Sequence, residues 1–342
     1  IYTIPEDIRQ EGLDREILSI LNLHERVNIR EEDRQRAKWM SFVGKLTTPK
    51  TRSITIGITG KYAELRDAYA SIDKAVEHCS AHLGARIGLR WIDTTEVDQA
   101  KIDQHVSELD GVIVPGGFGS RGVEGKIAFV RAARESQLPY LGICLGFQVA
   151  VIEFARNVLG LEEASSTEFW ADTPHPVISE LPEQKRIEGL GGTMRLGGQD
   201  VQILPGTLAH FLYGGRPSIR ERFRHRYEVE PRYIEQLEAA GLVFSGRHPT
   251  RPIMQFLELR RPTSDTPGDG PVVTHPYFVG AQFHPELTGR PLRPQPMFMG
   301  LIAAAICRKY GHAVDPRDQF GAELLRWIPS DPPPQQPQTV EA

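Results

Sequence analysis

The chain has 342 residues, which is long enough to bury a large core and to form two domains. Its formal net charge of −4 gives no general attraction to nucleic acid or to a membrane surface. Three cysteines cannot form a disulfide framework, and no run of 18 apolar residues is present. We therefore expect a cytoplasmic protein that binds neither nucleic acid nor membrane.

The first 50 residues are charged and irregular, with Glu-Glu-Asp-Arg-Gln-Arg at 31–36. This composition predicts one or two short helices, followed by a linker that ends near Pro49. The chain opens on Ile1 rather than on methionine, and we interpret it as the C-terminal piece of a longer protein.

Strand and helix patterns alternate after the linker. Three apolar segments predict strands, at 54–59, 87–92 and 111–114. Apolar residues at helical spacing from Leu65 to Leu83 predict a helix, with Cys79 on its buried face. This order indicates an α/β fold, in which helices cover both faces of a central, mostly parallel sheet.

A strand-to-helix junction at Cys144 is where we place the chemistry. Residues 140–143 predict a short buried strand, and 145–159 predict a helix that begins directly after the cysteine. Gly142 and Gly146 lie two residues to either side. This is the spacing of a nucleophile elbow, a tight turn at which helix amides favour the thiolate. A free cysteine is more often an ordinary buried residue, and the glycines are what favour a nucleophile.

The second half of the chain changes to short strands and turns, which predicts a small antiparallel β region. Strands are expected at 191–197, 201–204 and 278–286, and a last helix at 297–310. The turn-forming segment 263–271 is expected at the tip of a hairpin. The tail at 313–342 is rich in proline and glutamine, and we expect disorder from about residue 330.

A thiol nucleophile needs a base, and His284 stands out among the eleven histidines. It ends the last predicted strand, and in an extended chain its side chain points to the same side as that of Glu286, which could hold the ring. The Pro-Gly-Gly turn at 115–117 offers the amide of Gly117, which together with the amide of Leu145 could bind a developing oxyanion. Alone, that turn could equally be a plain tight turn.

Taken together, Pro-Gly-Gly at 115–117, Gly-Ile-Cys-Leu-Gly at 142–146 and Phe-His-Pro-Glu at 283–286 resemble the motifs of class I glutamine amidotransferases. Other stretches resemble the CTP synthase family in particular. They are Ile-Tyr-Thr-Ile-Pro at the start, Gly-Gly-Thr-Met-Arg-Leu-Gly at 191–197 and Arg-His-Arg-Tyr-Glu-Val at 224–229. The resemblance covers residues 1 to about 310.

The resemblance implies a flavodoxin-like amidotransferase domain at 51–312, preceded at 1–50 by the end of a synthetase domain and a linker. The full-length enzyme would use ATP and Mg²⁺ to aminate UTP to CTP, with GTP as an allosteric activator. Its partners would be L-glutamine and the synthetase domain of the same polypeptide, in a homotetramer. No cofactor and no metal is expected in the glutaminase part, and the chain contains no Gly-x-x-x-x-Gly-Lys-Ser/Thr phosphate loop.

Position by position, the resemblance makes Cys144 the nucleophile of a triad completed by His284 and Glu286, with Gly117 and Leu145 at the oxyanion. The implied glutamine contacts are Gly117, Leu145, Gly146, Phe147, Gln148, Glu168 and Arg226. The last two suit the α-ammonium and α-carboxylate of the free amino acid. A lid that responds to GTP would correspond to about 119–126, with Arg121 and Glu124 as possible contacts.

Three other interpretations fit parts of the sequence. A degenerate, inactive amidotransferase that serves only assembly is disfavoured because all three triad positions are filled. A stand-alone thiol hydrolase acting on γ-glutamyl substrates would share the elbow and the base, but the synthetase-like opening argues against it. A nucleic-acid-binding face could form from the arginines at 216, 220, 222, 224 and 226. Glutamates at 221, 228 and 230 dilute that charge, and no aromatic platform accompanies it.

Overall fold

The computed structural model describes residues 1–60, 69–96, 98–180, 194–260, 275–312 and 316–326. Two expectations fall outside these ranges, namely the hairpin tip at 263–271 and the disorder of the tail from about 330. The strands that flank the first of them, β11 (Met254–Leu259) and β12 (Phe278–Ala281), do pair in antiparallel fashion.

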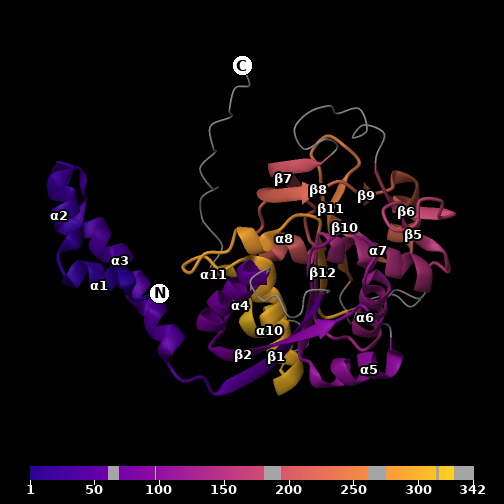
Figure 1. Ribbon diagram of the computed structural model, residues 1–342, viewed down its shortest axis with the longest axis horizontal. Helices are drawn as coiled ribbons and strands as arrows, with labels where there is room; N and C mark the ends of the chain where they lie inside the picture. The colour runs from indigo at the N-terminus through magenta and orange to yellow at the C-terminus, as the bar shows by residue number, and fades with distance from the viewer. Residues whose placement is uncertain (61–68, 97, 181–193, 261–274, 313–315, 327–342) are drawn as a thin grey trace.

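Within the described residues, a nine-stranded sheet forms the centre of the molecule (Figure 1). Its order is β2-β1-β3-β4-β12-β11-β10-β7-β8. The bounds are β1 Arg52–Gly60, β2 Ala85–Asp93, β3 Gly111–Val114, β4 Tyr140–Ile143, β7 Arg195–Ile203, β8 Ser218–His225, β10 Leu242–Arg247, β11 Met254–Leu259 and β12 Phe278–Ala281. From β2 to β12 neighbouring strands are parallel, and from β12 to β8 they are antiparallel. The α/β class is confirmed, and the antiparallel strands extend the same sheet.

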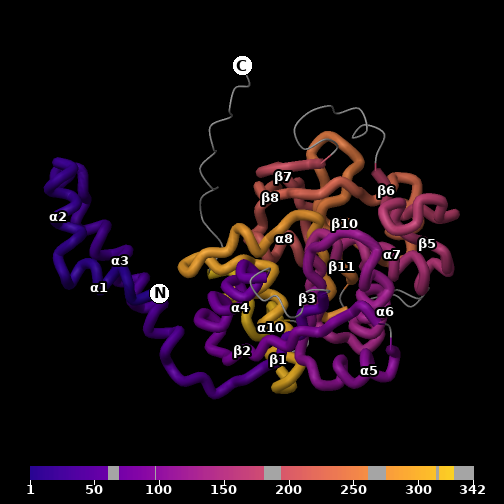
Figure 2. Tube along the Cα trace, in the orientation of Figure 1, coloured from indigo at the N-terminus to yellow at the C-terminus, as the bar shows by residue number. Residues whose placement is uncertain are grey.

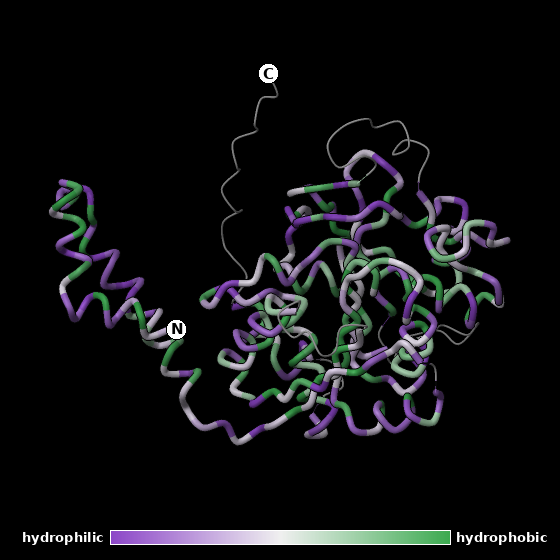
Figure 3. The backbone as a smooth tube through the Cα atoms, in the orientation of Figure 1, coloured by the Kyte–Doolittle hydropathy of each residue, from purple (hydrophilic) through white to green (hydrophobic). Residues whose placement is uncertain are grey.

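Helices cover both faces of this sheet. One face packs against α4 (Ala70–Leu83) and α10 (Pro296–Tyr310), and the other against α6 (Val123–Glu135) and α7 (Leu145–Asn157). The shorter helices are α5 (Gln99–Glu108), α8 (Leu208–Leu212), α9 (Ile234–Ala239) and α11 (Pro316–Arg326). Hydrophobic residues concentrate along the central strands and the helix faces that cover them (Figure 3). The predicted Cys79 and its apolar neighbours on α4 lie in this core.

The N-terminal segment is more helical than predicted. It forms α1 (Ile4–Gln10), α2 (Leu13–Ile20) and α3 (Ile29–Thr47), which project from the body as an arm (Figure 2). The charged run that suggested a linker lies inside α3, whose first turn is capped by the side chain of Asn28. The arm joins the body where Tyr2, Phe42 and Val43 pack near α4, and the Tyr2 hydroxyl donates to Glu77 at 2.7 Å.

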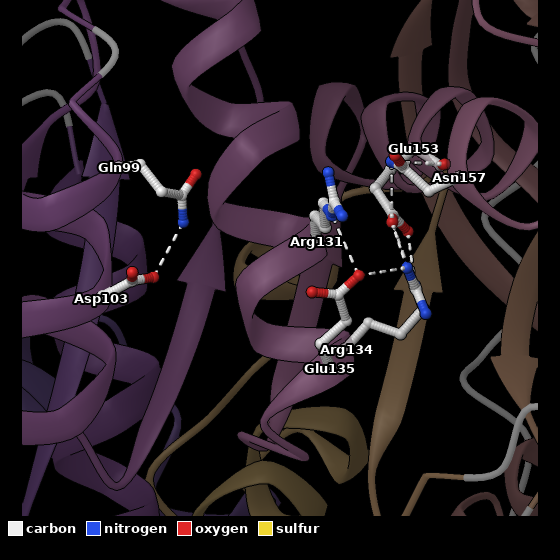
Figure 4. Close-up of polar contacts among 7 residues, drawn as sticks. All are labelled: Gln99, Asp103, Arg131, Arg134, Glu135, Glu153 and Asn157. Carbon is white, nitrogen blue, oxygen red and sulfur yellow. Dashed lines mark hydrogen bonds and ion pairs between the residues drawn. The ribbon is translucent and has the colours of Figure 1, made fainter.

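A smaller sheet lies beside α7 and consists of β5 (Ala164–Ser166), β6 (His175–Ser179) and β9 (Glu228–Val229). The helices α6 and α7 are joined by a buried ion pair between Arg134 and Glu153 (Figure 4). No helix in the described ranges joins the length and the apolar character needed to cross a bilayer.

Candidate active site

Cys144 lies at the predicted elbow, after β4 and as the N-cap of α7. Its φ of 51° and ψ of −97° fall in a region that residues with a side chain rarely adopt. The backbone amide of Cys144 donates to the carbonyl of Ala281 at 2.7 Å, which helps to hold this conformation. The residue is 7% exposed, so the nucleophile is almost completely shielded from solvent.

Glycine is required at both predicted elbow positions, because other atoms of the protein lie too close to leave room for a Cβ. A Cβ on Gly146 would overlap the carbonyl oxygen of Val114, and a Cβ on Gly142 would lie 2.7 Å from the carbonyl carbon of Gly146. The Tyr140 hydroxyl would also lie 2.6 Å from a Cβ on Gly142, but the backbone atoms named here cannot turn aside as a side chain can. The strand, the turn and the helix therefore approach one another only because these positions lack a side chain.

Gly146→Ala is expected to lower the free energy of unfolding by about 3 kcal/mol, the upper part of the range for overpacking, and to displace the elbow. Gly88→Ala in β2 is the matched control, because a Cβ there meets only the Ile54 carbonyl oxygen at 3.8 Å. The control should change stability by less than about 1 kcal/mol. Denaturant unfolding of both variants checks this, and equal losses would contradict the role given to the backbone contact.

His284 and Glu286 lie together, as predicted. His284 Nδ1 is 2.7 Å from Glu286 Oε1, and both side chains are largely buried. The predicted reason was wrong, because β12 ends at Ala281 and residues 285–287 form a 3₁₀ turn. Proline after His284 favours such a turn, and the turn brings the carboxylate back to the ring. The backbone amide of His284 donates to the carbonyl of Arg222 at 2.9 Å.

Cys144 and His284 act on each other electrostatically. Burial alone lowers the pKa of His284, but hydrogen bonds with Cys144 and Glu286 outweigh it and raise the pKa to about 9. The ring is therefore charged at neutral pH when it faces a thiolate. A Cβ on Gly116 would lie 3.0 Å from His284 Cε1 and 3.5 Å from Cys144 Cβ, so this glycine borders both groups.

One contact opposes a charged ring. Arg224 Nε lies 3.3 Å from His284 Nε2 and can donate only when that nitrogen carries no proton. A protonated His284 Nε2 and a hydrogen bond donated to it by Arg224 therefore exclude each other. Arg224 is exposed and can turn away, whereas Cys144 and Glu286 are buried beside the ring, so we favour the charged ring as the form that faces a thiolate.

Gly117 and Leu145, whose amides are the two predicted oxyanion donors, lie next to each other. A Cβ on Gly117 would lie 3.2 Å from Leu145 Cδ2, which places the Pro-Gly-Gly turn against the first residue of α7. Amides of a first helical turn have no acceptor within their helix, so the Leu145 amide can serve a ligand. Lys126 is buried nearby and donates to the carbonyl of Pro115 at 3.4 Å.

The residues after Leu145 differ in what they can offer a ligand. Gly146 and Phe147 are buried, and the Phe147 ring belongs to the core, so these two could meet a substrate only through the backbone. Gln148 donates through Nε2 to the carbonyl of Tyr227 at 2.9 Å and to Gln282 Oε1 at 3.2 Å. These bonds tie α7 to the segment that carries Arg226, whose side chain is exposed.

Glu168 contacts the predicted lid directly, because its Oε1 accepts from the Gly119 amide at 2.8 Å. The second half of that lid is already the first turn of α6, with Gly122 as its N-cap. A Cβ on Gly125 would overlap the carbonyl oxygen of Thr94, and Glu124 pairs with Arg156 at 2.7 Å. Movement would therefore be confined to residues 117–121, which include the exposed Arg121.

Gln282 was not predicted as a site residue, and its Nε2 lies 3.7 Å from Cys144 Sγ. It is two residues before His284 in the predicted strand, so the same alternation that selected Glu286 could have selected it. Arg224 was considered only as part of an arginine face. Arg220, Arg222 and Arg224 are indeed exposed along β8, but Arg220 pairs with Asp200 at 2.9 Å and Arg224 reaches His284.

The chain is similar in sequence to known proteins. The family model described as glutamine amidotransferase class-I matches residues 64–264. CTP synthase of Carboxydothermus hydrogenoformans is 46% identical over 306 residues, and that of Archaeoglobus fulgidus is 45% identical over 306. Each match covers 90% of this chain and 53% of the relative, so the chain spans about half the length of these curated relatives.

Among solved structures, the glutaminase domain of Trypanosoma brucei CTPS with bound acivicin is 33% identical, with a TM-score of 0.66. The match covers 77% of this chain and 97% of that one.

Proposed function

The chain belongs to the class I glutamine amidotransferase family and carries a glutaminase domain of the CTP synthase type, and we propose that it hydrolyses L-glutamine to supply ammonia for making CTP from UTP. The observation that carries this proposal is the His284–Glu286 pair, joined at 2.7 Å, beside a cysteine at a nucleophile elbow.

In the proposed reaction, the Cys144 thiolate attacks the carbon of the glutamine side-chain amide, and the Gly117 and Leu145 amides bind the oxyanion. His284 gives its proton to the leaving nitrogen, and ammonia departs as the thioester forms. The neutral ring then takes a proton from water, which attacks the thioester carbon. Glutamate leaves, the thiolate and the charged ring are restored, and Glu286 holds the ring through Nδ1 in both steps.

Glu168 and Arg226 would select the free amino acid. A glutamine α-ammonium would compete with the Gly119 amide for the Glu168 carboxylate, which would link substrate binding to the position of the lid. The α-carboxylate would pair with the exposed guanidinium of Arg226.

Arg226→Ala is expected to raise KM for glutamine about 10- to 100-fold, the effect of losing a hydrogen bond to a charged group, and to lower kcat much less. Arg220→Ala is the matched control, since this arginine is exposed on the neighbouring strand and pairs with Asp200. Steady-state kinetics of glutamate release give both constants. A fall in kcat at unchanged KM would contradict the binding role of Arg226.

In the whole enzyme, we propose that ammonia passes to a synthetase domain of the same polypeptide, which uses ATP and Mg²⁺ to activate UTP. GTP would activate hydrolysis through the lid, with Arg121 and Glu124 as candidate contacts. We further propose a homotetramer in the cytoplasm. The resemblance to the CTP synthase family and the match over 90% of the chain support this part of the proposal.

The test is glutamate release by the purified protein from L-glutamine and from a γ-glutamyl dipeptide, each with and without GTP. Preferential release from glutamine supports the proposal. Release from the dipeptide alone would favour the γ-glutamyl hydrolase instead. A full-length protein that releases glutamate from neither, with ATP and UTP present, would overturn both.

A further inference from the structure

A buried carboxyl group lies behind the His284–Glu286 pair and has no part in the reaction above. Glu221 on β8 is 6% exposed, and its side chain points into the core. Its Oε1 accepts from the Tyr213 hydroxyl at 3.0 Å and from Gln295 Nε2 at 3.4 Å. Its Oε2 lies 3.0 Å from the Thr288 hydroxyl, at the end of the turn that carries Glu286.

The number of protons in this network indicates the charge of Glu221. Thr288 Oγ1 lies 3.0 Å from Glu221 Oε2 and 3.0 Å from the Pro285 carbonyl, but the hydroxyl has one proton to donate. A carbonyl can only accept. With an ionised Glu221, the Thr288 proton must be shared between Glu221 Oε2 and the Pro285 carbonyl. With a protonated Glu221, Thr288 can donate fully to Pro285 while Glu221 donates to Thr288, so each contact has a proton of its own and the protonated form fits the network better.

The surroundings also favour the protonated form. The groups that face Glu221 are Tyr213 after α8, Gln295 before α10, Thr288, and the carboxylate of Glu286 on the turn. Burial is the main effect that raises the pKa of Glu221, and the charge of Glu286 adds to it. The ionised form of Glu221 accepts hydrogen bonds from Tyr213, Thr288 and Gln295, and these bonds oppose the rise, so that the pKa is about 7.

We propose that Glu221 is a positioning residue for the His284–Glu286 pair: as a neutral carboxylic acid, it holds the turn 285–288 through Thr288 and leaves Glu286 as the carboxylate that faces the ring. This inference rests on the proposed function only in taking His284 as the base. Gln295 extends the same network, since its side chain donates to the Tyr213 hydroxyl at 2.7 Å and accepts from the Met297 amide at the start of α10. The turn is thereby attached to a core helix.

The charge of Glu221 has a consequence for the reaction at alkaline pH. When Glu221 loses its proton, a second negative charge appears beside Glu286, and the bond to Thr288 must rearrange. Both changes act on His284, because the added charge stabilises the protonated ring and the turn is held less firmly. Activation of water needs the neutral ring, so the second step should slow as Glu221 ionises.

Glu221→Gln tests this, because the amide can donate to Thr288 and accept from Tyr213 and never ionises. Its kcat should stay within about two-fold of wild type near pH 6.5, and the ratio of variant to wild type should rise towards pH 8.5. Glu221→Ala should lose about 10- to 100-fold in kcat with little change in KM, because the turn is no longer held. Thr288→Ser should keep activity, and Thr288→Val should lose it.

A second measurement needs no glutamine, namely the pH dependence of Cys144 alkylation by iodoacetamide, with Cys144→Ser giving the background from the other thiols. The Glu221→Ala and Thr288→Val profiles should be displaced from the wild-type profile. Near neutral pH, the Glu221→Gln and Thr288→Ser profiles should coincide with the wild-type profile. If Glu221→Ala does not fold, the comparison of Thr288→Val with Thr288→Ser stands in for it.

Loss of activity in Glu221→Gln as severe as in Glu221→Ala would overturn the proposal, since an ionised carboxylate would then be required. An activity ratio independent of pH would overturn it too. A wild-type protein that releases no glutamate would instead refute the proposed function, and the alkylation profiles would still decide the role of Glu221.

Discussion

Cys144→Ala is expected to lower the rate of glutamine hydrolysis by roughly 10⁴- to 10⁶-fold, as removal of a covalent nucleophile does in other enzymes. Alanine keeps the Cβ and removes the sulfur, so the elbow should keep its conformation and its bond from the Cys144 amide to Ala281. The other two thiols cannot replace it, because Cys79 and Cys307 belong to α4 and α10 and not to the elbow. Glutamate release measures the loss.

The control for this variant is Cys79→Ala, which also removes a buried sulfur. It should keep glutaminase activity and lose about 1 to 2 kcal/mol of stability through a small cavity. In the full-length enzyme, Cys144→Ala should still make CTP from supplied ammonia. Hydrolysis that survives the substitution would refute the nucleophile, and loss of ammonia-dependent synthesis would show that the cysteine serves the fold.

Among the substitutions proposed for this protein, Arg134→Met should cause the largest loss of stability, about 3 to 5 kcal/mol, because it leaves a buried carboxylate without its partner. Glu153 has no exposed side-chain surface, and both of its oxygens lie 3.0 Å from Arg134 Nε (Figure 4). Asn157 supplies one more bond, at 3.1 Å. Denaturant unfolding gives the change. The double variant Arg134→Met, Glu153→Met should recover most of it, since no charge is then buried.

Arg131→Ala is the matched control on the same helix, because Arg131 pairs with Glu135 at the surface (Figure 4). An exposed pair of this kind contributes about 0 to 1 kcal/mol. Equal losses from Arg131→Ala and Arg134→Met would contradict the argument from burial.

The loss of stability caused by Arg134→Met should depend on pH in a predictable direction. Burial raises the pKa of Glu153 even beside Arg134, and removal of the guanidinium must raise it further. A raised pKa in the folded state favours folding at low pH, and this advantage is lost as pH rises through that pKa. The stability deficit of the variant should therefore be smaller at pH 5 than at pH 8. A deficit that is the same at both would argue against an unpaired carboxylate.

Local patterns predicted the elements nearest the nucleophile well, because an apolar run and a glycine turn carry enough information by themselves. β3 and β4 have the predicted bounds, and α7 begins at the predicted residue. The bend after β12 was missed, although Pro285 is a local signal against a strand that continues to Glu286. The length of α3 was not predicted, because the run of charged residues at 31–36 suggested only short helices before a linker, although its N-cap residue Asn28 was available as a signal.

Contacts between distant segments could not be predicted. In the strand order β8 is separated from β12 by β11, β10 and β7. It nevertheless lies along the His284 turn, as the bond from the His284 amide to the Arg222 carbonyl shows, and this contact has no local signature. The roles of Gln282 and Glu221 depend on that arrangement. Glu221 shares its strand face with Ile219 and Phe223, which is a signal of burial, but its partners Tyr213, Gln295 and Thr288 come from other segments and could not be predicted.

The pairing of β4 with β12 has a consequence for how the protein is made. Ala281 pairs in register with Ile143, so a single ladder sets the distance between Cys144 and His284, although 140 residues separate them in the chain. A ribosome therefore completes the elbow long before the base emerges, and a strand that must enter between β4 and β11 pairs late. A nascent or truncated chain that lacks β12 has a thiol without its base. Glutaminase activity would begin only after β12 has paired with β4 and β11.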